Sequence, residues 1–493
     1  MANLDYDLSS IQEARDKARQ GLLAAKKMND LSDQQIDKII RNMIKVAEEN
    51  ALMLGRMAVE DTGFGKAEDK AYKNHMASTL LYESIKNNKV RGIIGSDPSK
   101  KILTVAHPVG LILGLVPSTN PTATVIYNSI IAIMAGNTIL FSPHPTSVRS
   151  TSKTAELMAK AAEEAGAPKG VIDCIQQVSM EATNELMKGQ ECSLIIATGG
   201  PGMVKAAYSS GKPAIGVGAG NSPAYIERTA NVKEAVEKIV TSKVFDYGTI
   251  CASEQSIVCE KCNEKEVVEQ LEKNHCYFLN EEELQKVCNS IFYPGTTTMA
   301  ADCVGRSAQD IADKSGITIP KGTKILIGRQ DGIGKDYPLS YEKLTSVLGF
   351  YVVEDWKEAC IVCYGLLEHG FGHTLSIHTE DPEIVLKFAV KPASRIIVNS
   401  GGGTGGAGLT TGLQPAFTLG CGTCGGSSVS ENVGPQHLIN IKKIAFGIKD
   451  PRTVIQEDQS FHAWNENQSN VTKEISDEEI RRIVQRVMKD LQS

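Results

Sequence analysis

Cysteine is the residue type in this sequence with the most versatile chemistry. Twelve cysteines occur, and Cys251 stands in a Gly/Thr-containing turn, FDYGTICASEQ (245–255), after a segment with helical periodicity. A cysteine thiolate is a strong nucleophile that can hold an acyl group as a thioester. No neighbour of Cys251 in the sequence marks it as reactive, so an inert thiol is the alternative at this point.

Three cysteine pairs have the C-x-x-C spacing of metal sites: Cys259/Cys262, Cys360/Cys363 and Cys421/Cys424. None of them has a second pair at the distance that a zinc ribbon requires. The opening segment MANLDYDLSS lacks the basic and apolar regions of a secretory signal, so we expect a cytoplasmic protein with reduced thiols. We therefore predict core thiols and no metal; a metal site is the alternative.

Glycine-rich turns are candidates for phosphate binding. ATGGPGM (197–203) joins a predicted strand to a helix, whose N-terminal N–H groups and dipole attract phosphate. A plain tight turn is the alternative there. GRQDGIGKDY (328–337) does not fit a P-loop, because five residues separate Gly328 from Gly334 and Asp336 replaces the magnesium-binding Ser or Thr. GVGAGN (216–221) lacks the G-x-G-x-x-G spacing.

Regularly alternating strands and helices would position these turns. Apolar runs predict strands at 110–116, 137–141, 170–178, 193–199 and 213–217. Helical periodicity predicts helices at 121–136, 147–167, 181–189 and 201–211. Apolar strands separated by helices indicate a parallel sheet that is covered on both faces. This arrangement also explains the uncharged stretch 102–141, which prolines interrupt before it could span a bilayer.

The remaining segments predict a second α/β pattern and a hairpin. The second pattern starts at about residue 227, and a glycine-dense segment follows at 401–428. VRGIIGS (90–96) and KILTVAH (101–107) predict a hairpin, and LINIKKIAFGI (438–448) predicts another strand. The net charge of −6, from 52 Lys and Arg against 58 Asp and Glu, argues against nucleic-acid binding.

Several segments, taken in order, resemble the aldehyde dehydrogenase superfamily and specifically its CoA-acylating branch, over about residues 5 to 449. VPSTNPTATV (116–125) resembles the loop with the oxyanion-binding asparagine, here Asn120. FDYGTICAS resembles the nucleophile motif and implies Cys251 as the nucleophile. IIVNSG (396–401) is similar to a strand end near the active site.

The same resemblance implies a nicotinamide cofactor site. SPHP (142–145) stands near the cofactor ribose, which assigns Ser142, Pro143 and His144; an ordinary loop histidine is the alternative for His144. ATGG (197–200) resembles the turn at the cofactor phosphates, which assigns Thr198, Gly199 and Gly200. YEKLTSVL (341–348) resembles the segment whose glutamate, here Glu342, holds the nicotinamide ribose. Cys421, in a Gly-Cys-Gly, is expected to be structural or to line the pocket, and Cys424 stands where the resemblance implies an aromatic residue.

GVGAGNSP (216–223) departs from the hydrolytic members of the superfamily. Those members carry Glu-Leu-Gly-Gly, and the glutamate activates the water that hydrolyses the acyl-enzyme. Alignment on the shared Gly-x-Ser-Pro ending places this glutamate at Val217. An apolar side chain cannot act as a general base, so we expect the Cys251 thioester to survive until the thiol of CoA attacks it.

The resemblance implies an α/β, aldehyde dehydrogenase-like fold: a Rossmann-like cofactor domain (1–89 and 107–226), an α/β catalytic domain (227–430) and a β-hairpin oligomerisation arm (90–106 and 436–450). It implies reversible, ping-pong oxidation of propanal or acetaldehyde to acyl-CoA with NAD and coenzyme A, in a homo-oligomer (dimer or tetramer). Two alternatives stay open: a hydrolytic aldehyde dehydrogenase that yields the free acid, and a non-catalytic microcompartment scaffold.

The segment 474–493 predicts a helix with one apolar stripe, preceded by a polar linker (451–473). Ser476 and Glu479 form a capping box. The stripe consists of Ile480, Ile483, Val484, Val487, Met488 and Leu491. Such tails resemble encapsulation peptides, which implies docking on shell proteins or co-encapsulated enzymes inside a bacterial microcompartment. Packing on the chain's own body or on a neighbouring subunit is the alternative; a membrane partner is not expected.

Overall fold

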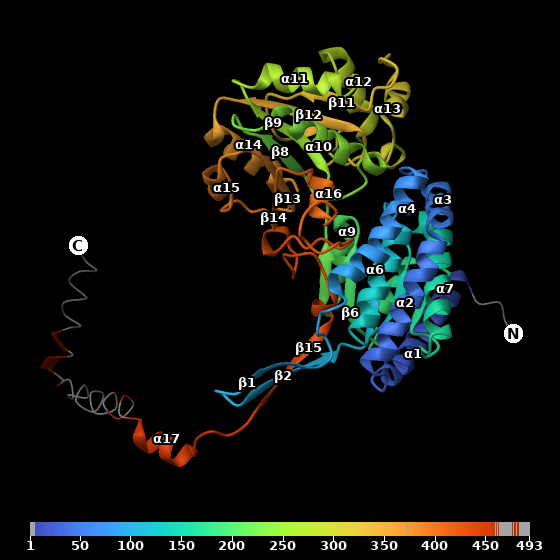
Figure 1. Cartoon of the computed structure of the whole chain (residues 1–493), viewed down its shortest axis with the longest axis vertical. Helices are drawn as coiled ribbons and strands as arrows, with labels where there is room; N and C mark the ends of the chain where they lie inside the picture. Colours follow the sequence, from blue (N-terminus) through green and yellow to red (C-terminus); the bar gives the residue numbers. More distant parts are fainter. Residues whose placement is uncertain are drawn as a thin grey trace. The chain divides into compact units, whose positions relative to one another are not determined.

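The computed structural model describes residues 5–370 and 372–458, together with 460, 462, 476, 478, 479, 481 and 482 (Figure 1). The chain forms two compact units. The larger unit contains Met1–Gly92 and Ala106–Ile441, and the smaller unit contains Ile93–Val105 and Lys442–Ser493. Among the described residues, no helix combines the length and the apolar character that crossing a membrane requires.

The larger unit contains a five-stranded sheet with the order β5-β4-β3-β6-β7, in which all neighbours are parallel. Leu113 of the central strand lies opposite Leu140 on one side and Ile195 on the other. The strands are β3 (Leu111–Leu115), β4 (Thr138–Ser142), β5 (Ile172–Cys174), β6 (Cys192–Thr198) and β7 (Ala214–Val217).

The edge strand β5 is shorter than the predicted run of 170–178. The main-chain N–H groups of Gln176 and Gln177 donate to the carboxylate of Glu13, at 2.9 and 2.7 Å. These N–H groups are satisfied by a side chain of the first helix and do not extend the sheet. An apolar run alone does not reveal such a competing acceptor.

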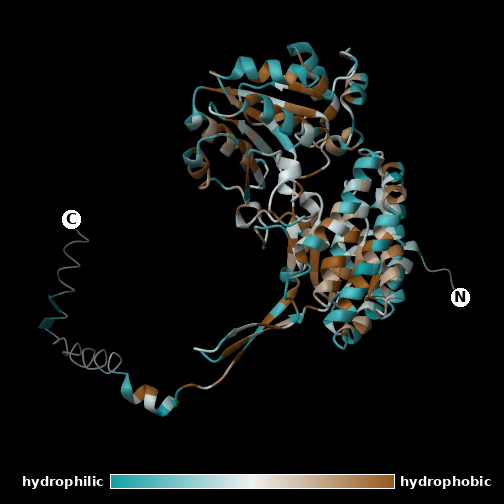
Figure 2. Cartoon of the chain, in the orientation of Figure 1, coloured by the Kyte–Doolittle hydropathy of each residue, from teal (hydrophilic) through white to brown (hydrophobic). Residues whose placement is uncertain are grey.

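Helices cover both faces of this sheet. Alternate residues of β3 point to opposite sides, since Ile112 packs with α2, α6 and α7, whereas Leu113 packs with α1 and α8. Figure 2 shows the strands largely in brown, the colour of hydrophobic residues. The helices are α1 (Tyr6–Met28), α2 (Asp33–Glu49), α3 (Ala51–Thr62), α4 (Ala67–His75), α5 (Leu81–Ile85), α6 (Pro121–Met134), α7 (Val148–Glu164), α8 (Met180–Lys188) and α9 (Pro201–Tyr208).

A second, seven-stranded parallel sheet in the same unit has the order β10-β11-β12-β9-β8-β13-β14. The connection between the two sheets is short, because β7 ends at Val217 and the next strand begins at Ser222. The strands are β8 (Ser222–Ile226), β9 (Glu254–Glu260), β10 (Cys276–Phe278), β11 (Ile325–Arg329), β12 (Val347–Val353), β13 (Thr374–His378) and β14 (Arg395–Val398).

Helices also pack on both faces of the second sheet. Residues of α10 and α11 form one apolar cluster with Ile257, and residues of α14 and α15 form another with Val258. The helices are α10 (Val232–Val244), α11 (Glu264–Lys273), α12 (Glu281–Ile291), α13 (Ala308–Ser315), α14 (Trp356–Glu368), α15 (Pro382–Phe388) and α16 (Gly402–Gly406). The predicted α/β fold is confirmed.

The predicted hairpin forms part of a three-stranded sheet with the order β1-β2-β15. Its strands are β1 (Gly92–Asp97), β2 (Ile102–Pro108) and β15 (Ile439–Ala445). The Asp97 carboxylate closes the turn by accepting hydrogen bonds from the Ser99 hydroxyl and the Lys100 N–H. Several apolar side chains of these strands and of the segment after β15 are exposed to solvent: Ile93, Ile441, Ile444, Phe446 and Ile448.

The predicted linker 451–473 begins with a helix, α17 (Pro451–Glu457). Asp450 caps this helix by accepting the N–H of Arg452, and Pro451 occupies its first turn. The apolar stripe predicted for 474–493 lies outside the described residues. Within the predicted capping box, the N–H of Glu479 donates to the Ser476 hydroxyl at 3.3 Å.

Candidate active site

A cavity of about 490 Å³ in the larger unit contains every residue predicted for the site. This volume is typical of small-molecule pockets. The predicted residues that line it are Asn120, Ser142, Pro143, His144, Thr198, Gly199, Gly200, Cys251 and Glu342. Residues up to 222 positions apart in the sequence therefore meet at one cavity, as the predicted motif order requires.

The cavity lies at the carboxyl ends of the five-stranded sheet. Its walls include the segments that follow β3, β4, β6 and β7, namely 116–120, 142–145, 198–200 and 217–219. Parallel sheets bind ligands at this edge because the loops after the strands converge there. Cys251 and Glu342 come from segments that precede strands of the second sheet, β9 and β12.

Asn120 stands at the start of α6 and has a fixed side chain. Its Oδ1 accepts a hydrogen bond from Lys73 Nζ at 2.7 Å, and its Nδ2 donates to the main-chain oxygen of Thr249 at 2.9 Å. Thr249 is two residues before Cys251. The amide of Asn120 is therefore tied to the loop that carries the predicted nucleophile.

Cys251 is partly exposed, and it lines the cavity. The pKa of its thiol is raised to about 12, mainly by burial and also by the nearby Cys421 and Glu342, while Arg395 opposes the rise. A thiolate is disfavoured in a region of low dielectric. The thiol is consequently protonated at neutral pH in the ligand-free protein.

Glu342 is the only carboxylate among the residues that line the cavity. Burial raises its pKa to about 7. Its Oε1 accepts the main-chain N–H of Gly220 at 3.0 Å. Gly220 lies in the short connection between the sheets, so the carboxylate is bound to the backbone of that connection.

Val217 is the last residue of β7 and is 2% exposed. It lines the cavity, and it is the residue that the predicted alignment sets against the glutamate of hydrolytic members. Its neighbour across the sheet is Thr198 of β6. The structure therefore places an isopropyl side chain, which accepts no proton, in the wall of the cavity that Cys251 also lines.

The turn at Thr198–Gly200 suits phosphate through its backbone. Gly200 is the N-cap of α9 and has no side chain that could occupy the first N–H groups of the helix. A Cβ added to Gly199, Gly200 or Gly202 would meet no atom within 4 Å, so open space faces this backbone. An uncapped helix N-terminus beside open space fits the pyrophosphate of a nicotinamide dinucleotide.

Three buried residues lie near Cys251. Arg395 and His373 were not predicted as site residues, and the role of Cys421 was left open between a structural and a pocket-lining one. Arg395 donates to the main-chain oxygen of Gly420 at 2.6 Å and to that of His373 at 3.3 Å. Burial and Arg395 hold the pKa of His373 well below its usual value. Cys421 lines a separate cavity of about 400 Å³ together with Cys424. The one sequence signal for Arg395 is a charge that opens an otherwise apolar strand, RIIVN.

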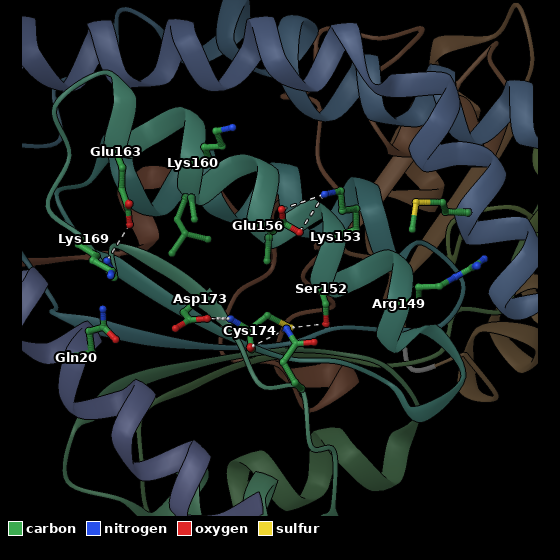
Figure 3. Close-up of a pocket in the computed structure, with 16 residues that line it drawn as sticks. Gln20, Arg149, Ser152, Lys153, Glu156, Lys160, Glu163, Lys169, Asp173 and Cys174 are labelled. Atoms are coloured by element: carbon green, nitrogen blue, oxygen red, sulfur yellow. Dashed lines mark hydrogen bonds and ion pairs between the residues drawn. The ribbon is translucent and has the colours of Figure 1, made fainter.

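A larger cavity of about 630 Å³ lies between α7 and β5 (Figure 3). Two of its charged side chains are paired with neighbours: Lys153 lies 3.0 Å from Glu156, and Asp173 lies 2.7 Å from Lys17. Cys174 in its wall has a pKa raised to about 12 by burial. None of the predicted site residues lines it, so we do not assign the chemistry there.

Residues 5–280 match the sequence profile of the aldehyde dehydrogenase family. The chain belongs to this family. It spans about half the length of the first curated relatives it matches. The bifunctional aldehyde-alcohol dehydrogenase of Escherichia coli K12, for example, is 43% identical over 421 residues, which cover 84% of this chain and 47% of that protein.

Two other aldehyde dehydrogenases match over nearly their whole length. The succinate-semialdehyde dehydrogenase (acetylating) of Clostridium kluyveri is 36% identical over 453 residues, which cover 91% of this chain and 98% of the relative. The crystal structure of an acetylating aldehyde dehydrogenase from Geobacillus thermoglucosidasius has a TM-score of 0.89 and 48% identity, over 90% of this chain and 99% of that chain. The predicted resemblance to the acylating branch is confirmed.

Two propionaldehyde dehydrogenases share the fold at 26% identity. One, from the fucose utilisation bacterial microcompartment of Clostridium phytofermentans, has a TM-score of 0.80 over 88% of this chain and 97% of that chain. The other, from Rhodopseudomonas palustris, was determined with bound CoA and an acylated cysteine; its TM-score is 0.79 over the same shares, 88% and 97%.

The raised thiol pKa predicts how Cys251 reacts in the ligand-free protein. We expect iodoacetamide to alkylate it slowly at pH 7 and about tenfold faster for each unit of pH up to 10, because the thiolate fraction rises in that proportion below the pKa. Mass spectrometry of the peptide that contains Cys251 measures the rate, and Cys251→Ala identifies the peptide. A rate that levels off between pH 6 and 8 would contradict the raised pKa.

Proposed function

We propose that this protein oxidises a short-chain aldehyde, propanal or acetaldehyde, to its acyl-CoA with NAD⁺ and coenzyme A. The acyl group is carried as a thioester on Cys251, and the reaction is reversible. The support is the meeting of Cys251, Asn120 and Val217 at one cavity, together with the relatives described as acetylating or acylated. The sum of the reaction is aldehyde, NAD⁺ and CoA giving acyl-CoA, NADH and a proton.

The first half of the reaction uses Cys251 and Asn120. The Cys251 thiol loses its proton, which is the proton released in the overall reaction, and its sulfur bonds to the aldehyde carbon while the carbonyl electrons move to the oxygen and form a thiohemiacetal anion. Asn120 Nδ2 carries two N–H groups: it donates to the Thr249 oxygen at 2.9 Å and makes a longer hydrogen bond of 3.4 Å to the Thr119 hydroxyl, which the oxyanion would replace. The Cys251 N–H is the second donor. Donors of this kind are typically worth 10²–10³ in rate.

We propose that the nicotinamide cofactor binds at the carboxyl ends of the strands of the five-stranded sheet. The Thr198–Gly200 turn would hold its phosphates, Ser142, Pro143 and His144 would lie near the adenosine ribose, and Glu342 near the nicotinamide ribose. When bound, the cofactor supplies the oxidant by accepting a hydride. We propose NAD over NADP because no Lys or Arg is among the residues that line the cavity, so a 2′-phosphate would find no cation there.

The fate of the thioester is inferred from two residues of the cavity wall. Val217 is apolar and stands at the position assigned to the hydrolytic base, and Glu342, the one carboxylate among the described lining residues, accepts the Gly220 N–H. We infer that neither residue deprotonates water beside the thioester, because Val217 accepts no proton and Glu342 is assigned to the nicotinamide ribose. The thiol sulfur of CoA attacks the acyl carbon instead, and the Cys251 thiolate leaves. A thiol is a better nucleophile than water when no base assists.

The half-reactions can be separated in time. Without CoA, we expect a burst of NADH that equals the number of active sites and then stops; with CoA, turnover continues. Stopped-flow absorbance of NADH measures both, and Cys251→Ala is expected to abolish burst and turnover alike. Sustained turnover without CoA, with free acid as the product, would favour the hydrolytic alternative.

We also propose that the protein is a homo-oligomer that works inside a bacterial microcompartment. Support for the oligomer comes from the exposed apolar side chains of the β1-β2-β15 sheet and the segment after it, such as Ile93 at 61% and Phe446 at 57% exposure. Exposed apolar surface of this kind marks an interaction site. Support for the compartment comes from the apolar stripe of 474–493 and the microcompartment relative.

Two variants separate these assembly roles and serve as controls for each other. Ile444→Asp/Phe446→Asp is expected to reduce the oligomer to smaller species while capture by a co-expressed shell protein persists. Deleting 474–493 is expected to abolish capture while the oligomer and the rate in solution persist. Light scattering after size exclusion and co-sedimentation with shells are the measurements. An oligomer that survives the first change would contradict the role of the β1-β2-β15 sheet. An oligomer that dissociates after the second change would assign residues 474–493 to oligomer assembly.

A further inference from the structure

A buried ion cluster lies behind Asn120 and links α4 to the nucleophile loop. Lys73 of α4 is 1% exposed, and its ammonium group donates to Asn120 Oδ1 at 2.7 Å, to Asp246 Oδ2 at 2.6 Å and to the Thr249 hydroxyl at 3.1 Å. Charged side chains are rarely buried without a partner. Lys73 therefore contacts the amide of the predicted oxyanion donor and the loop before Cys251 at the same time.

The chemistry of these partners fixes one orientation of the amide. An ammonium group only donates, and a main-chain carbonyl only accepts. Rotating the Asn120 amide by half a turn would set its NH₂ against Lys73 and its oxygen against the Thr249 carbonyl, and both hydrogen bonds would be lost. Unsatisfied buried groups are costly, so Lys73 and Thr249 together hold the amide with its nitrogen toward the loop.

Asp246 holds Lys73 in turn. It is fully buried and accepts hydrogen bonds from Lys70 and from the Thr249 hydroxyl as well as from Lys73. Burial alone would raise its pKa, but the two lysines lower the pKa of Asp246 to about 2. The backbone of Asp246 has φ of 51°, a left-handed conformation that few side chains adopt. Such strained positions persist where the surroundings fix them.

We propose that Lys73 is a positioning residue for the aldehyde-oxidising half-reaction: it holds and polarises the Asn120 amide so that the Nδ2 N–H that does not bind Thr249 meets the oxyanion in place of the Thr119 hydroxyl. This proposal rests on the proposed role of Asn120. A cation at Oδ1 draws electron density from the amide and makes its N–H a stronger donor. Lys73 transfers no proton and touches no substrate; it acts only through Asn120.

Lys70 provides a matched control within the same cluster. It is 2% exposed and donates to the same Asp246 oxygen, at 2.9 Å. Its other hydrogen bond is to the main-chain oxygen of Thr119, at 2.9 Å, and not to the Asn120 side chain. Removing either lysine takes one buried cation from Asp246, whereas only the loss of Lys73 frees the amide of Asn120.

The test compares the NADH burst without CoA in Lys73→Met, Lys70→Met, Asn120→Ala and the double variant Lys73→Met/Asn120→Ala. The burst reports aldehyde oxidation alone, so it does not depend on the fate of the thioester. We expect Lys73→Met to slow the burst at least about tenfold more than Lys70→Met, with a similar loss of thermal stability in both. In the Asn120→Ala background, Lys73→Met should change the rate less than about twofold.

The outcomes separate the two levels of the proposal. Equal slowing by Lys73→Met with and without Asn120 would show that Lys73 acts independently of the amide and would overturn the positioning role. A wild-type burst in Lys73→Met would overturn it as well. A wild-type burst in Asn120→Ala would refute the oxyanion assignment and the positioning role together, while failure of CoA to sustain turnover would concern the proposed function only. If Lys73→Met does not fold, Lys73→Arg keeps the charge and is still expected to slow the burst, because its planar guanidinium cannot reproduce these three contacts.

Discussion

The main chain of Gly220 runs so close to that of Cys251 that a Cβ at position 220 would lie 2.1 Å from the Cys251 carbonyl oxygen. This approach is possible only for glycine, and it occurs in the short connection between the two sheets. The N–H of the same residue binds Glu342. The connection thus contacts the main chain of the proposed nucleophile, binds the Glu342 carboxylate and follows directly on the apolar Val217.

Most charged side chains near this site are buried in the protein and do not line the cavity. The residues that line the cavity include one carboxylate and neither Lys nor Arg, while Lys73 and Arg395 are buried beside Asn120 and His373. Such surroundings favour an uncharged sulfur, as a thiol or a thioester, over a thiolate. The raised pKa of the Cys251 thiol has the same cause. A phosphate group bound in this cavity would therefore be held by backbone N–H groups and the α9 dipole.

Much of the fold could be predicted because both sheets are parallel and buried. Strands such as β3 are apolar on both faces, and the helix α6 that follows has no charge, so periodicity and composition located them. The end of β5 could not be predicted, because Glu13, about 160 residues away, binds the N–H groups that would extend it. The helix in the predicted linker was missed because a proline after an aspartate is as common in turns as at helix starts.

In the site, too, some residues could be predicted from local sequence and others could not. Motifs located the residues that line the cavity, since each lies in a turn with a distinctive local sequence. Lys73 and Asp246 lie 173 positions apart, and each is ordinary in its own segment: a lysine within a charged helix and an aspartate before a tyrosine. Only folding brings them together behind Asn120, so local sequence carries no signal for them.

The lifetime of the acyl group on Cys251 tests the central claim most directly. Intact-protein mass spectrometry after mixing the enzyme with propanal and NAD⁺, without CoA, would follow the propionyl adduct over time. We expect a propionyl adduct on Cys251 whose lifetime exceeds the time of one turnover by orders of magnitude. It should disappear at once when CoA is added. An adduct that decays to free propionate within one turnover time would show that a base for hydrolysis exists, and would contradict the account.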